Sequence, residues 1–113
     1  MNKNIELVKH YFEISNDSNI DEIKKLFTEN STYSSTNTGL YLWADKIIEM
    51  QEEFHWKFLS LNWDIDKIEE IKDWIIEVKF SFNWVDKKWK KISFWWAENI
   101  IVFENKIQHI EIK

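Results

Sequence analysis

The stretch WIIEVKFSFNWVDKKWKKISFWWAENIIVF, residues 74–103, predicts two long antiparallel strands joined by a polar turn. In its first half, large apolar residues alternate with polar ones: Trp74, Ile76, Val78, Phe80, Phe82 and Trp84. A period of two is the pattern of a strand with one buried and one exposed face. Asp86, Lys87 and Lys88 then supply the turn. We therefore expect this hairpin to form the centre of an antiparallel sheet.

The returning strand is apolar on both of its faces. One face carries Trp95, Ala97, Ile101 and Phe103, and the other carries Phe94, Trp96, Ile100 and Val102. We expect the second set to form an apolar stripe on the outside of the sheet, larger than a monomer normally exposes to water. This stripe predicts a two-fold homodimer through the outer sheet face.

The rest of the chain divides into helical and extended segments. Helical spacing of apolar residues covers residues 4–15, about 19–28 and 44–56, and extended patterns cover residues 32–35, 40–42, 59–66 and 107–112. Helices that are segregated from antiparallel strands indicate the α+β class. We expect one domain over residues 1–113, in which a strongly curved antiparallel sheet packs against three N-terminal helices as a cone-shaped, cystatin-like α+β roll.

Composition excludes several classes of function. The chain has no cysteine, so thiol nucleophiles, thiolate metal sites and disulfides are excluded. Its net charge is −5 and all its basic residues are Lys, which argues against nucleic acid as a partner. The N-terminus is amphipathic and lacks the apolar core of a signal peptide, and no apolar run is long enough to span a membrane. We expect a cytoplasmic protein without a membrane partner.

A small cone has an apolar pocket at its mouth unless side chains fill it. With eight Trp and eight Phe, the pocket could be packed shut or could hold a small hydrophobic molecule, and the sequence leaves both interpretations open. If the pocket is open, we expect its ligand to contact a set of mostly aromatic residues: Ser35, Trp43, Phe54, Trp63, Phe80 and Phe82.

Short motifs near both ends of the chain carry a family resemblance. They are Val8-Lys9-His10-Tyr11-Phe12, Asn16, Ile20-Asp21, Ile23, Leu26-Phe27, Thr32 and the hairpin FENKI at residues 103–107. Together with the element order of the whole chain, they resemble the nuclear transport factor 2-like superfamily, which includes ketosteroid isomerase, scytalone dehydratase and the polyketide cyclases. The resemblance implies a cone-shaped fold with a small-molecule site inside it.

The resemblance also implies roles for particular residues. Tyr11 falls where ketosteroid isomerase keeps the tyrosine that holds the oxyanion, and Asn99 falls at or next to the position of its protonated Asp. The position of the general base falls at Ser35, which cannot hold an abstracted proton at neutral pH. Two hydrogen-bond donors without a matching base argue against steroid isomerisation. Alternatively, Tyr11 anchors the first helix to the sheet through its hydroxyl group.

Histidines offer a replacement base. His109 shares its strand with Glu111, and if both point inward they could form a base and the group that orients it. His55, near the end of the third predicted helix, is a second candidate. The sequence has no motif with the spacing of metal ligands and no glycine-rich phosphate loop, so we expect neither a metal nor a cofactor.

The residues are compatible with two functions. In the first, the protein is an isomerase, dehydratase or cyclase acting on a small hydrophobic carbonyl compound, with Tyr11 and Asn99 as donors and His109 or a carboxylate as base. In the second, it is a non-catalytic module that binds a ligand or a protein and dimerises through its outer sheet face. Fold alone cannot choose between them, because function depends on the site that a fold carries.

Overall fold

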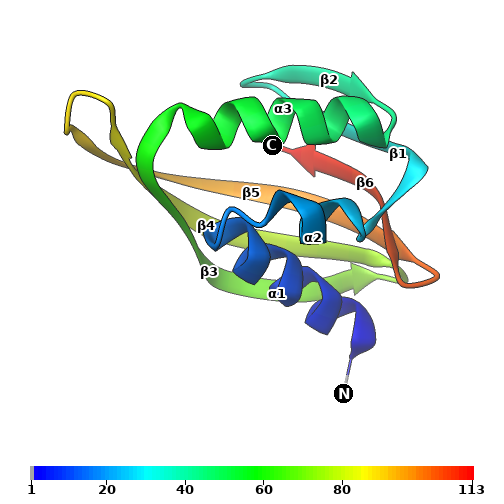
Figure 1. Cartoon of the computed structure of the whole chain (residues 1–113). Helices are drawn as coiled ribbons and strands as arrows, with labels where there is room; N and C mark the ends of the chain where they lie inside the picture. The colour runs from blue at the N-terminus through cyan, green and yellow to red at the C-terminus, as the bar shows by residue number, and fades with distance from the viewer. Residues whose placement is uncertain (1) are drawn as a thin grey trace.

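A computed structural model describes residues 2–113, so Met1, the first residue of the expected domain, lies outside the described residues. Three helices and six strands form in the described part of the chain (Figure 1). In chain order they are α1 (Lys3–Asn16), α2 (Ile20–Lys24), β1 (Phe27–Ser35), β2 (Gly39–Leu42), α3 (Ala44–Trp56), β3 (Phe58–Lys72), β4 (Ile75–Asp86), β5 (Lys91–Phe103) and β6 (Lys106–Ile112).

All six strands join one sheet in the order β2-β1-β6-β5-β4-β3. The helices lie on one side of the sheet, with α1 across β3 and β4 and α3 beside β1 and β2 (Figure 1). The register shifts in the pairing of β3 with β4 and of β5 with β6, as at β-bulges, which bend and twist strands locally. The predicted α+β cone is confirmed. The sheet is mixed rather than purely antiparallel, because β1 and β6 pair in parallel.

The inner face of the sheet is set by the pairing of β4 with β5. Phe80 lies opposite Trp96, and Ile76 lies opposite Ile100. Directly opposed residues of an antiparallel pair share a face, so the even-numbered residues of both strands face the helices. The buried core of the inner face includes Ile76, Val78, Phe80, Phe82, Ile100 and Val102.

This pairing corrects the predicted outer stripe. Ile100 and Val102 are fully buried, and Trp96 packs against Phe80 and Phe82. Phe94 continues the same face to its exposed end, where its ring stacks on Trp96. The prediction was wrong because both faces of β5 are apolar, so alternation along the sequence does not show which face is buried. Only the register of β5 with β4 decides which face points inward. The outer face instead carries Trp95, Ala97, Ile101 and Phe103.

The second helix is shorter than its sequence pattern predicts. The pattern extends to about residue 28, but α2 ends at Lys24 and β1 already begins at Phe27. The Ile107 amide donates a hydrogen bond to the Leu26 carbonyl, and Phe27 pairs with Ile107 of β6. Pairing with β6 therefore overrides the helical preference of residues 25–28.

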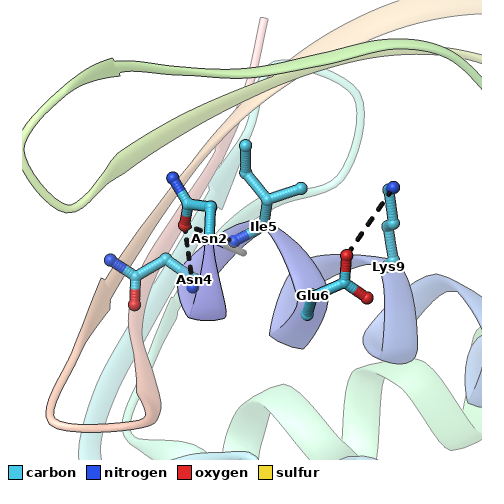
Figure 2. Close-up of polar contacts among 5 residues, drawn as sticks. All are labelled: Asn2, Asn4, Ile5, Glu6 and Lys9. Atoms are coloured by element: carbon cyan, nitrogen blue, oxygen red, sulfur yellow. Dashed lines mark hydrogen bonds and ion pairs between the residues drawn. The ribbon is translucent and has the colours of Figure 1, made fainter.

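The start of α1 is fixed by a cap and by a link to the sheet. The Asn2 side-chain oxygen accepts hydrogen bonds from the amides of Asn4 at 3.0 Å and Ile5 at 3.1 Å (Figure 2). The Asn2 and Asn4 side chains donate in turn to the Glu70 carboxylate of β3. The hydrogen bond from Asn2 is the largest of several that lower the pKa of Glu70. These contacts hold the first helix against β3.

One turn further along α1, Glu6 and Lys9 approach to 3.9 Å as an exposed ion pair (Figure 2). Exposed pairs of this kind add little stability. No helix within residues 2–113 is long and apolar enough to cross a membrane.

Candidate functional site

A cavity of about 90 Å³ lies between the helices and the inner face of the sheet. Aromatic rings from α1, α3, β3, β4 and β5 form most of its wall: Phe12, Phe54, Trp63, Phe80, Phe82 and Trp96. An apolar cavity of about 150 Å³ is large enough to take up benzene. At about 90 Å³ this cavity is smaller than that, so the cone is not packed shut but its free space limits a ligand to a molecule more compact than benzene.

Glu98 is the only acidic residue among those that line the cavity. It lies on β5 between Val78 of β4 and Ile112 of β6, and only 4% of its surface is exposed. Within residues 2–113, no hydrogen bond or ion pair reaches its carboxyl group. Burial, which disfavours the charged form, raises its pKa to about 8. Glu98 is thus mostly protonated at neutral pH.

Tyr11 brings a hydroxyl group from α1 into the same cavity. Its phenol oxygen accepts a hydrogen bond of 2.9 Å from the Gln51 side-chain amide of α3. Burial, with a smaller contribution from the nearby charge of Glu98, raises the pKa of Tyr11. The hydroxyl proton therefore stays in place and can be donated to a bound molecule.

The side-chain oxygen of Gln51 receives no hydrogen bond from the described residues. This oxygen is buried and has no hydrogen-bond partner within residues 2–113. Leaving a buried acceptor unpaired costs about 1–3 kcal/mol. Most buried polar atoms in native structures have a hydrogen-bond partner, so an unpaired acceptor beside a cavity is a place where a bound molecule can supply the missing donor.

His55 lines the cavity on the side of α3, at the start of a second hollow formed with Ser18 and Ser60. Its Nδ1 lies 2.8 Å from the Ser18 hydroxyl, and its ring lies 5.4 Å from that of Trp63. Burial lowers the pKa of His55, so the imidazole is neutral at pH 7. A neutral imidazole can accept a proton.

The structure brings some of the predicted site residues together. Tyr11, Ser35, Phe54, Trp63, Phe80 and Phe82 all line the cavity. Trp43 does not, because it precedes α3 at a φ of 77° and is half exposed.

Asn99 and His109 lie on the opposite face of the sheet. Asn99 pairs with Glu111, and His109 pairs with Ile101. Their neighbours Ile100 and Ile110 are fully buried on the inner face, so Asn99, His109 and Glu111 point outward. His109 Nδ1 lies 2.7 Å from the Thr32 hydroxyl on β1. None of the three lines the cavity with Tyr11.

A bulge explains the position of His109. The register of β5 against β6 shifts between Ile101 and Val102, opposite the step from Ile107 to His109. Counting outward from buried Ile107 therefore gives the wrong face for His109, since a bulge changes the alternation of side chains.

Sequence reasoning missed Glu98 and Gln51, although each left a signal. Glu98 has the same parity as Trp96, Ile100 and Val102, so it is the one carboxyl group within an apolar alternation. Gln51 lies three and four residues after buried Ile48 and Ile47, on the buried face of α3. Recognising either signal required knowing which face was inside.

No cluster of three or more His, Cys, Asp or Glu residues suited to a metal ion occurs within residues 2–113. The cavity therefore combines mostly apolar walls with the Glu98 carboxyl group, the neutral His55 imidazole, the side-chain amides of Asn37 and Gln51, and several hydroxyl groups, those of Tyr11, Tyr33, Ser15, Ser35 and Thr38. Such a set can hold a polar group and move a proton.

Neither a protein-family model nor a curated protein sequence matches this chain. Solved structures do match it. A protein with a ketosteroid isomerase-like fold from Catenulispora acidiphila DSM 44928, in complex with trimethylamine, aligns at a TM-score of 0.87 and 13% identity over 96% of this chain and 84% of that chain. An LEH-like epoxide hydrolase from M. tuberculosis aligns at a TM-score of 0.85 and 9% identity, over 97% of this chain and 80% of that chain.

A third solved structure, a SnoaL-like polyketide cyclase from Shewanella putrefaciens CN-32, aligns at a TM-score of 0.83 and 10% identity over 99% of this chain and 89% of that chain. At this level of identity the agreement concerns the fold, whose members include cyclases, epoxide hydrolases and isomerase-like proteins. The resemblance inferred from element order is confirmed at that level. The chain has the nuclear transport factor 2-like fold.

Proposed function

We propose that this chain is an enzyme of the isomerase, dehydratase or cyclase kind that acts on a small hydrophobic carbonyl compound in the cavity. The proposal depends on one observation, that the buried carboxyl group of Glu98 and the buried hydroxyl of Tyr11 line the same mostly apolar cavity. Strongly shifted pKa values in a cavity are typical of catalytic sites.

Glu98 and Tyr11 act as the donors in this proposal. Both hold their protons at neutral pH, because burial raises both pKa values. Two donors directed at a carbonyl oxygen stabilise the negative charge that develops when a proton leaves the neighbouring carbon. Glu98 thus takes the role that the sequence resemblance suggested for Asn99, the next residue along β5.

His55 is the base in this proposal. It is neutral, it lines the same cavity, and in the tautomer that donates Nδ1–H to Ser18 its Nε2 is free to accept a proton. In a β,γ-unsaturated carbonyl compound, transfer of a proton from the carbon beside the carbonyl to Nε2 forms a dienolate, whose oxygen accepts hydrogen bonds from Glu98 and Tyr11. Return of that proton to a different carbon completes an isomerisation without any other reactant.

The test is exchange of the protons next to the carbonyl group in small aliphatic ketones, followed by NMR in D₂O. We expect the wild type to exceed the buffer rate, and Tyr11→Phe and His55→Gln to lose most of this excess. Tyr41→Phe is the matched control, because Tyr41 does not line the cavity and its hydroxyl donates to the Thr38 carbonyl.

Folding of each variant is measured beside its rate. Tyr11→Phe leaves the Gln51 amide without its acceptor, so we expect a loss of about 1–3 kcal/mol in the free energy of unfolding. If the purely structural role of Tyr11 is correct, stability falls by this amount and exchange by the remaining folded protein is unchanged. That outcome, or no exchange by the wild type across the ketone panel, overturns the enzymatic proposal.

The second candidate is a binding module without catalysis that forms a homodimer through its outer sheet face. Its support is the set of large apolar residues that this face exposes, with Trp95 70% exposed and Phe103 41% exposed. The relative from Catenulispora acidiphila in complex with trimethylamine is a precedent for binding of a small molecule on this fold.

A further inference from the structure

The cavity holds more hydrogen-bond acceptors than the protein can satisfy. The Glu98 carboxyl group and the Gln51 side-chain oxygen are both more than nine-tenths buried, and neither receives a hydrogen bond within residues 2–113. Within residues 2–113 no lysine lines the cavity, and the sequence contains no arginine. An ionised Glu98 therefore has no positive side chain among these residues to pair with.

The walls around these acceptors suit a compact cation. Phe54, Trp63 and Phe82 line the cavity, where Phe82 stacks with Trp63 at a centroid distance of 4.6 Å and Phe54 lies 5.5 Å from Phe82. The face of an aromatic ring attracts a positive charge, most strongly where water is excluded. These rings therefore offer apolar surface to alkyl groups and favourable electrostatics to a charge.

We propose that the cavity binds a small primary or secondary alkylammonium ion, whose N–H groups donate to the Glu98 carboxylate and the Gln51 side-chain oxygen. The alkyl groups lie against the aromatic walls, and the volume of about 90 Å³ restricts the ligand to short or branched amines. This inference goes beyond the proposed function. The cation binds when Glu98 is ionised, whereas the neutral carbonyl compound of the proposed reaction binds when Glu98 is protonated.

The cation resolves the energetic problem of this carboxyl group. An unpaired buried carboxylate is costly, so in the empty cavity Glu98 keeps its proton to about pH 8. A bound ammonium ion supplies both the opposite charge and the donors, and a buried charge is tolerated when it is paired and hydrogen-bonded. Binding below pH 8 therefore releases the Glu98 proton.

The other groups that face Glu98 do not provide a competing charge. Tyr11 from α1 and Tyr33 from β1 are both neutral, because burial raises their pKa values. His55 from α3 is neutral as well, since burial disfavours its charged form and lowers its pKa. β3, β4 and β6 contribute only uncharged residues to the cavity, such as Trp63, Phe80 and Ile112.

The test is calorimetric titration of the full chain with isopropylammonium chloride and, separately, with isopropanol, a neutral molecule of similar shape. We expect the ammonium ion to bind at least about tenfold more tightly than the alcohol, because only the ion can pair with the carboxylate. Below pH 8 we expect the measured heat to change with the ionisation enthalpy of the buffer, since binding releases a proton. Equal affinity for the two compounds overturns the proposal.

Variants locate the binding. Glu98→Gln keeps the shape of the side chain and removes its charge, so we expect a loss of at least about tenfold in ammonium affinity and little change for isopropanol. Glu111→Gln, on the outer face of the sheet, removes the same charge from the molecule and should bind like the wild type. Unchanged ammonium binding by Glu98→Gln contradicts the proposal.

This experiment is independent of the ketone assay. Ammonium binding without proton exchange leaves the cation site intact and removes the proposed enzyme. Proton exchange without ammonium binding supports the proposed enzyme and rules out the cation site. If both occur, isopropylammonium should inhibit exchange competitively, because the two ligands share one cavity.

Discussion

At the scale of single residues, Glu98 is a side chain that the packing of the fold does not require and that the proposed site does. A buried carboxyl group without a partner contributes nothing to packing that an apolar side chain could not provide. Its burial raises its pKa from the ordinary 4.5 to about 8. This shift makes the stability of the protein depend on pH in a way that a single substitution can isolate.

The folded state binds the Glu98 proton more tightly than the unfolded state does. Between about pH 4.5 and pH 8 the folded protein is protonated at Glu98 while the unfolded chain is not, so the free energy of unfolding falls as pH rises. The slope from this group is about 1.4 kcal/mol per pH unit, and it vanishes above pH 8. The stabilising contribution of the bound proton is thus complete at acidic pH and lost as pH rises through the folded-state pKa.

We predict that Glu98→Gln removes this slope. Urea unfolding from about pH 5 to about pH 9 should show the variant gaining stability relative to the wild type as pH rises. Glu111→Gln should follow the wild-type curve, because Glu98 is still present. Parallel curves for Glu98→Gln and the wild type contradict a buried, partnerless carboxyl group at this position.

At the scale of elements, β5 is the strand whose two faces the sequence does not distinguish. Ile100 is fully buried against the helices, whereas its neighbour Ile101 is only half buried on the outer face. Both are isoleucines within the same strand, and both pair with an isoleucine of β4. They form a matched pair for measuring which face is inside.

We predict that Ile100→Ala lowers the free energy of unfolding by about 2–5 kcal/mol, the cost of a cavity in a packed core. Ile101→Ala should cost less than half as much, since its side chain already contacts water. Urea unfolding at a fixed pH measures both. A larger loss from Ile101→Ala would reverse the assignment of inner and outer faces.

At the scale of the whole molecule, no helix or strand within residues 2–113 covers the outer sheet face (Figure 1). The helices all lie on the other side of the sheet (Figure 1), and the rings of Trp74 and Phe103 meet at 5.1 Å while both are partly exposed. An exposed apolar surface of this kind is typical of an interface between protein chains. The proposed homodimer would bury it.

We predict that light scattering at micromolar concentration gives twice the 14.0 kDa mass of the chain. Trp95→Lys should shift the protein toward the monomer, because it places a charge in the proposed interface. Trp89→Lys, at the exposed turn between β4 and β5, is the control and should leave the mass unchanged. A wild-type protein that scatters as a monomer contradicts the dimer.

Much of the architecture follows from patterns within the sequence. The third predicted helix, residues 44–56, has the bounds of α3, because apolar spacing and polar flanks agree there. Alternation along residues 74–84 identified the buried face of β4, except at Trp74, which lies half exposed in the turn with a φ of 68°. The sequence pattern predicts a helix or strand reliably where one face is buried and the other is exposed to solvent.

The site was less accessible from sequence, because it depends on contacts between distant segments. Tyr11 was identified by resemblance, but its partner Gln51 is 40 residues away on another helix. Asn99 was expected beside Tyr11, whereas its neighbour Glu98 lies in the cavity. A difference of one residue reverses the face of a strand, and no local pattern indicates which of two adjacent polar residues points inward.

The sequence by itself determined the class of this protein: three amphipathic helices, a set of long antiparallel strands and a largely aromatic interior follow from residue type and spacing alone. Only the tertiary structure decided which face of β5 is buried, that β1 pairs in parallel with β6, and that Glu98 rather than Asn99 lines the cavity with Tyr11. The physical reason is that periodicity is a local property of the chain. Register and bulges are set by hydrogen bonds between strands that are far apart in sequence.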